Sequence, residues 1–155
     1  MRRLCPWKPH VRKGVLDPRL PKIPQYAGIP GWLLLTHNEA NEPIAMFVDM
    51  KDHQTILPIV MDERLFSDTV FRVVQLAPAV FLVCDIRYLN GRYVYERVPY
   101  TDRRALVETL LDEFHQTDLT ALISYDKVPA TTFVRGWEQY DERPGTVGVF
   151  LPADE

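Results

Sequence analysis

The sequence predicts an α+β domain built on antiparallel sheet, with one main helix and an extended N-terminal arm. Short apolar or alternating runs of strand length follow one another through most of the chain, and turn residues separate them. A single stretch, at about residues 101–115, has apolar residues at helical spacing. The 155 residues suffice for one domain with a sizeable core and are too few for two comfortable ones.

Residues 1–30 form a basic, proline-rich arm. Six of the 13 prolines lie in it, and proline disfavours helix at itself and at the residue before it, so we expect extended chain without regular pairing. The arm carries one acid, Asp17, and leaves about −9 of charge for the remainder of a chain whose net charge is −3. It either wraps its own domain or docks on a partner protein or the phosphate backbone of RNA. Its cations are Arg2, Arg3, Lys8, Arg12, Lys13, Arg19 and Lys22.

The remaining residues, 31–155, form the domain and begin with strands joined by polar turns. The first two strands should pair as a hairpin, because a five-residue polar turn separates them. Pro58 cannot donate a backbone hydrogen bond and therefore indicates an edge strand. The strands are expected at residues 31–37, 43–49, 55–60 and 68–74.

The central strand starts with six apolar residues, 79–84, a run typical of a strand buried on both faces. One acid, Asp85, follows, and a lone acid at the end of a buried strand is more often a hydrogen-bonded structural group than a catalytic one. Asn90-Gly91 is the strongest two-residue hairpin signal, so residues 92–98 should return as an alternating partner strand.

The helix at about 101–115 has four apolar residues on one face, and Thr101 is its expected N-cap. A further strand is expected at 119–125, an irregular stretch at 129–143, and a last strand at 146–152.

Composition and residue spacing argue against disulfide-rich, metal-binding, membrane-spanning and secreted classes of protein. Cys5 and Cys84 are far apart in sequence, which indicates no disulfide framework and favours a reducing, intracellular compartment. The four histidines are scattered without metal-ligand spacing, so we expect neither a metal nor a cofactor. No apolar run approaches the roughly 20 residues needed to cross a bilayer, and no apolar segment opens the chain. We therefore expect no membrane insertion and no secretory signal.

Three segments of the sequence can be compared, in their order along the chain, with the motifs of known families. Residues 81–91 read Phe-Leu-Val-Cys-Asp-Ile-Arg-Tyr-Leu-Asn-Gly, residues 100–106 open the helix with paired arginines, and residues 147–152 read Val-Gly-Val-Phe-Leu-Pro. This order resembles that of the covalent nucleotidyltransferase superfamily, and within it the mRNA-capping guanylyltransferases more than the DNA ligases. The resemblance covers roughly residues 26–152 and implies a nucleotidyltransferase-like fold.

The resemblance also implies a chemistry whose residues are missing here. In the family, a lysine in Lys-x-Asp-Gly attacks the nucleotide α-phosphate. The corresponding residues, 26–31, read Tyr-Ala-Gly-Ile-Pro-Gly, without lysine or carboxylate. The family's Asp-Gly-Glu reads Asp-Thr-Val at 68–70, and its late acid is replaced at 146–147 by Thr-Val. The chain stops before the family's late lysine motif and its oligonucleotide-binding-fold domain, and Asp85 alone remains.

We therefore expect a catalytically silent, guanylyltransferase-like module that acts as a structural or binding subunit of a larger assembly, with protein partners and with RNA as a candidate component. One alternative is an active capping or ligase-type enzyme with a displaced lysine, Lys22 or Lys51, and Asp85 as its acid. Another is a cap- or nucleotide-binding protein, for which the cap-binding domain of snurportin is a non-catalytic precedent. A coincidental likeness of a small α+β domain also stays open.

A cap or nucleotide binder would stack the base on an aromatic side chain. Each aromatic here is more often a packing residue than such a platform. The candidate nucleotide- or cap-binding residues are Trp32, Asp85, Tyr88 and Trp137, with Tyr93 and Tyr140 as further aromatic candidates.

Overall fold

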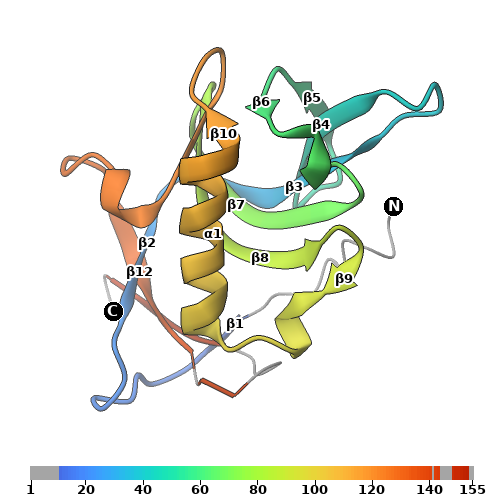
Figure 1. Cartoon of the computed structure of the whole chain (residues 1–155). Coiled ribbons are helices and arrows are strands. Elements are labelled where there is room, and N and C mark those ends of the chain that lie inside the picture. The colour runs from blue at the N-terminus through green and yellow to red at the C-terminus, as the bar shows by residue number, and fades with distance from the viewer. Residues whose placement is uncertain (1–10, 141, 144–147, 154–155) are drawn as a thin grey trace.

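The computed structural model describes residues 11–140, 142–143 and 148–153. Within these residues the chain forms two main sheets, one α-helix, a short two-stranded pair and three short 3-10 helices (Figure 1). Most strand pairs are antiparallel, which confirms the α+β class built on antiparallel sheet. The described residues contain no helix long and apolar enough to span a membrane.

The larger sheet has the strand order β11-β8-β7-β3-β4-β5, with β9 paired to β8. Its β3–β4 hairpin runs in register from Gly31 opposite Asp49 to His37 opposite Pro43, as the polar turn predicted. Strand β5 lies at the edge of the sheet, as expected, but it ends at Leu57, so the expected strand over 55–60 is too long and Pro58 lies outside it. The bounds are β3 (Ile29–His37), β4 (Pro43–Asp49), β5 (Gln54–Leu57), β7 (Thr69–Ala77), β8 (Val80–Leu89), β9 (Arg92–Tyr93) and β11 (Ala121–Ile123).

The central strand β8 is buried as predicted, and its turn has the expected geometry. Asn90 and Gly91 have φ angles of 48° and 85°, the left-handed pair that a tight hairpin requires. The returning strand is shorter than predicted, because β9 ends at Tyr93 and a 3-10 helix (Val94–Glu96) follows. This turn carries Tyr95 inward, where the side chain is buried. The expectation of a strand over 92–98 is therefore wrong beyond residue 93.

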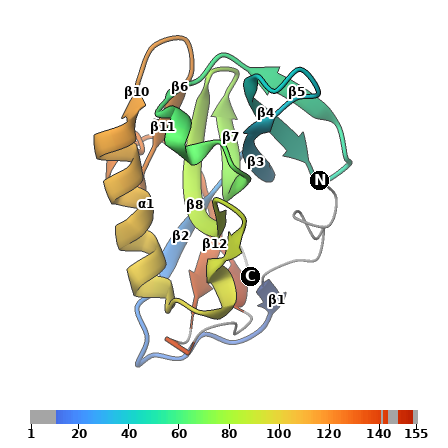
Figure 2. The same ribbon diagram turned by 45° about the vertical axis from the view of Figure 1, so that its right-hand side comes forward.

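The helix α1 (Tyr100–Phe114) matches the expected span within one residue. Its N-cap position is Pro99, and Thr101 lies inside the first turn, so the expected cap is wrong. Both views show α1 running beside β8 (Figure 2). It buries Val107, Leu110 and Leu111 against the apolar face of the larger sheet, where they join the main core.

The smaller sheet, of order β1-β13-β12-β2, contains two departures from expectation. The predicted arm is regularly paired within the described part, since two of its segments form edge strands and β3 begins at Ile29. The stretch expected to be irregular, 129–143, contains β12. Both errors have one cause: the pairing joins opposite ends of the chain and leaves no local pattern. The bounds are β1 (Val11–Lys13), β2 (Ile23–Tyr26), β12 (Val134–Gln139) and β13 (Gly148–Pro152).

Short elements complete the fold. Strands β6 (Val60–Met61) and β10 (His115–Gln116) pair at the C-terminal end of α1. Two further 3-10 helices span Glu63–Leu65 and Tyr125–Lys127. Strand β11 pairs with β8 in parallel and replaces the longer strand expected at 119–125.

Candidate functional site

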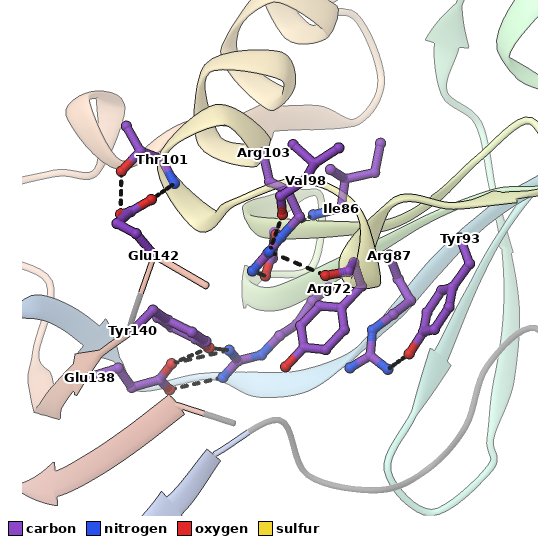
Figure 3. A network of polar contacts seen from close by, with 12 residues as sticks. Arg72, Ile86, Arg87, Tyr93, Val98, Thr101, Arg103, Glu138, Tyr140 and Glu142 are labelled. Atoms are coloured by element: carbon purple, nitrogen blue, oxygen red, sulfur yellow. Dashed lines mark hydrogen bonds and ion pairs between the residues drawn. The ribbon is translucent and has the colours of Figure 1, made fainter. Parts of the chain in front are cut away.

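A layer of charged and aromatic side chains lies between the two sheets (Figure 3). Arg72 of β7 donates two hydrogen bonds to the carboxylate of Glu138 on β12, at 3.1 and 2.8 Å. It donates a third, at 2.7 Å, to the hydroxyl of Tyr140, which itself donates to Glu138 at 2.9 Å. Burial alone would lower the pKa of Arg72, but Tyr140 and Glu138 hold that pKa well above its ordinary value. Arg72, Glu138 and Tyr140 therefore join the two sheets and form hydrogen bonds with one another.

A second ion pair connects β8 to α1. The guanidinium of Arg103 donates from Nε and Nη2 to the two carboxylate oxygens of Asp85, at 2.8 and 3.0 Å. Asp85 also accepts the backbone N–H of Ile86, and Arg103 donates to the carbonyl of Val98 at 2.7 Å. Each of the two charged residues is only 2% exposed. Burial opposes the charge on Arg103, but the hydrogen bonds and charge of Asp85 raise its pKa. In this conformation Asp85 is a hydrogen-bonded structural group.

A third arginine, Arg87, lies among aromatic rings. Its guanidinium carbon is 5.0 Å from the ring centre of Trp32 and 4.2 Å from that of Tyr95, and Nη1 donates to the Tyr93 hydroxyl at 3.3 Å. Burial lowers the pKa of Arg87. The rings therefore hold a cation supplied by the protein itself.

The aromatic candidates for base stacking are engaged in packing. Trp32 is 1% exposed and cannot stack on a base in this conformation. Tyr88 stacks on Tyr93 with ring centroids 4.8 Å apart, and Tyr140 stacks on Tyr100 at 4.3 Å.

Trp137 is half-buried on β12 of the smaller sheet, away from the β8 candidates in the larger one. The ammonium of Lys22 lies over its ring, at 4.6 Å from the centroid. The structure therefore separates Trp137 from Trp32, Tyr88 and Asp85 and does not gather the four candidates around one cavity.

The segment of residues 26–31 borders a small cavity. Residues 26–31 lead from β2 of the smaller sheet into β3 of the larger one, and a Cβ on Gly28 would lie 2.4 Å from the carbonyl oxygen of Gln75. The cavity measures about 40 Å³, enough for water and far below the several hundred cubic ångströms of ligand pockets. Its lining includes Tyr26, Gly28, Pro30, Arg72 and Glu138.

A much larger groove, of about 620 Å³, is lined in part by Ile23 and Pro24 of β2. It lies between the first turns of α1 and residues 21–24, and the side chain of Lys22 lines it. At one end the Glu142 carboxylate accepts hydrogen bonds from the backbone N–H and the hydroxyl of Thr101. The groove was not expected from sequence, because its walls come from four separate segments.

The cations of the predicted arm have different environments. Arg19 pairs with Asp17 at 2.9 Å on the surface, and Lys13 is exposed on β1. Arg12 also lies on β1, and Lys22 lines the groove. Arg2, Arg3 and Lys8 lie outside the described residues.

The described residues contain no group of three side chains suited to a metal ion. Cys84 is a free, buried thiol whose pKa burial raises to about 11, which makes it unreactive. Lys51 is exposed in the turn between β4 and β5. The residues that organise the polar layer, Arg72, Arg103 and Glu138, were not singled out from sequence, although a charge inside the apolar run 70–74 was a usable signal.

Comparisons with known proteins found no protein-family model and no curated protein that matches this chain.

Proposed function

We propose that this chain is a catalytically silent, guanylyltransferase-like module that serves as a binding subunit of a larger assembly. The observation that carries the proposal is the 40 Å³ cavity beside residues 26–31, where the resemblance places the reactive lysine. A nucleotide needs a site several times larger. Arg72 and Glu138, which line this cavity, already neutralise each other through two hydrogen bonds.

The Asp85–Arg103 pair supports the same reading. Asp85 is the acid that the resemblance places on the central strand, and Arg103 occupies both of its carboxylate oxygens. Freeing Asp85 for a metal or a ribose would leave a guanidinium buried without its partner, which costs several kcal/mol. Asp85 is therefore better placed to stabilise the fold than to take part in catalysis.

The displaced-lysine alternative has less support. A nucleophilic lysine is normally activated by burial or by neighbouring cations. Lys22 and Lys51 are both exposed. The cap-binding alternative is likewise weakened, because Trp32 is buried under Arg87 and Tyr88 packs on Tyr93.

The test is a covalent-adduct assay. The full chain is incubated with Mg²⁺ or Mn²⁺ and α-³²P-labelled GTP or ATP, and run on a denaturing gel. We expect no labelled band. A labelled band that disappears in Lys22→Ala or Lys51→Ala would overturn the proposal in favour of the displaced-lysine enzyme.

Two further measurements examine binding. Calorimetry with cap analogues, GTP and ATP should give no heat, and saturable heat would favour the cap-binding alternative. RNA binding through the arm should weaken with salt. It should be lost when Arg2, Arg3 and Lys8 are changed to Glu, a safer change than deleting residues 1–22, because β1 pairs with β13.

A further inference from the structure

The 620 Å³ groove beside α1 has an aromatic floor. Tyr100 and Tyr140 stack there with an interplanar angle of 9°, and Tyr125 lines the groove next to them. The guanidinium of Arg104 lies 4.6 Å from the ring centre of Tyr125. An aromatic ring of this groove is therefore already in cation–π contact with an arginine.

The groove is lined by more acidic than basic residues. Glu108, Asp126 and Glu142 line it beside two cations, Lys22 and Arg104, and Arg104 lies 3.8 Å from the Glu108 carboxylate. The acidic surface continues along the exposed side of α1 through Asp112 and Glu113. A surface of this charge attracts a cationic partner.

The chain itself contains a segment of complementary chemistry. Residues 3–9 read Arg-Leu-Cys-Pro-Trp-Lys-Pro, with the spacing Arg-x-x-Pro-x-x-Pro. Prolines three apart lie on one face of a polyproline II helix, which has three residues per turn and loses little entropy on binding. Such segments dock in aromatic-lined grooves, and an arginine ahead of the prolines can pair with a carboxylate at the rim.

We propose that the groove of one copy binds residues 3–9 of a second copy of this chain. The prolines and Trp7 would pack on the tyrosine floor, and Arg3 would pair with a carboxylate at the rim. The arm precedes β1, at one edge of the smaller sheet, whereas residues 21–24 continue into β2 at the opposite edge. Because the arm and the groove are different surfaces, the contact is heterologous, and it forms a reciprocal dimer, a larger closed ring or an open chain.

This inference rests on the proposed binding role and names its partner. The test is sedimentation velocity of the full chain over a series of concentrations at low and high salt. The sedimentation coefficient should rise with protein concentration and fall with salt. Glu142→Lys and Asp126→Lys in the groove, and Pro6→Ala with Pro9→Ala in the arm, should each weaken association by about tenfold. Glu39→Lys, an exposed acid in the β3–β4 turn, is the matched control and should leave association unchanged.

A charge exchange gives the sharpest measurement. Arg3→Glu should weaken association, and combining it with Glu142→Lys should restore part of the loss. A labelled peptide of residues 1–10 should bind the full chain, and Glu142→Lys should weaken that binding too. Circular dichroism of each variant checks that the fold is intact.

A chain that stays monomeric at every concentration and salt overturns this inference, as does association that Glu39→Lys weakens as much as Glu142→Lys. Neither result changes the outcome of the covalent-adduct assay, so the two proposals can fail separately.

Discussion

The carboxylate of Asp85, on the central strand, is held by both Nε and Nη2 of Arg103, in the first turn of α1. The side chains of both residues are 3% exposed, so the pair is shielded from water and from salt. The geometry fixes where the helix begins relative to β8, because Arg103 also donates to the carbonyl of Val98 just before the helix. The pair is a structural joint between strand and helix.

Asp85→Ala should destabilise the fold by about 3–5 kcal/mol, because it leaves the Arg103 guanidinium buried without a counter-charge. Urea denaturation followed by circular dichroism measures the loss. Replacing both partners, in Asp85→Leu with Arg103→Met, should cost much less than the sum of the single changes. Additive losses would show that the two side chains do not act as a pair.

Trp32 and Trp137 should respond differently to truncation. Trp32 is 1% exposed and packs with Leu34 and Val70, so Trp32→Ala should cost about 3–5 kcal/mol of unfolding free energy. Trp137 is half-buried beneath Lys22, and Trp137→Ala should cost about 1 kcal/mol. Urea denaturation monitored by circular dichroism compares the two variants. Equal losses would contradict the assignment of Trp32 to the core.

The parts of the fold that sequence predicted are those with local signals. The β3–β4 hairpin follows from a polar turn between apolar runs, and the β8–β9 turn follows from Asn90-Gly91. The helix follows from its apolar spacing. Each of these signals lies within about fifteen residues, the range over which periodicity and turn chemistry act.

The parts that sequence missed depend on distant partners. Strand β12 contains Gly136, and a Cβ there would lie 2.4 Å from the ring of Phe150, so the glycine suits a neighbour across the sheet. The first segments of the arm pair with β12 and β13 at the far end of the chain. No local sequence pattern predicts such pairing.

The ion-pair partners in the polar layer were likewise not predictable from sequence. The sequence marked Asp85 as a lone acid in an apolar run, but its partner Arg103 is 18 residues away. Glu138 lies 66 residues from Arg72. A single charge in a buried strand predicts that a partner exists, and only the fold identifies it.

Gly91→Ala should destabilise the fold by about 1–2 kcal/mol through the backbone alone. Gly91 has a φ of 85°, whereas the nearest atom to an added Cβ, the Ser67 carbonyl oxygen, would be 3.8 Å away. The cost therefore comes from the left-handed conformation and not from a clash. Gly91→Asn should lose less, since asparagine tolerates this region. Denaturant midpoints of the two variants test the order, and an equal loss would point to sterics instead.

Stability should fall as the pH drops, through His115 at the end of α1. Its Nδ1–H donates to the carbonyl of Val60 at 2.9 Å, and Nε2 accepts the backbone N–H of Leu122 at 3.2 Å. This arrangement requires the neutral ring. Burial lowers the pKa of His115 below its ordinary 6.5, although the Val60 carbonyl partly opposes the shift.

Because the folded pKa of His115 is the lower one, the unfolded chain binds the extra proton first as the pH falls. The stabilisation by His115 is therefore complete above the unfolded pKa and is lost as the pH falls through the folded one. Urea denaturation between about pH 7 and pH 5 should show this decline, and His115→Gln should flatten it. His37→Gln, at an exposed histidine, is the control and should keep the wild-type slope. If His115→Gln keeps that slope as well, another group controls the pH dependence.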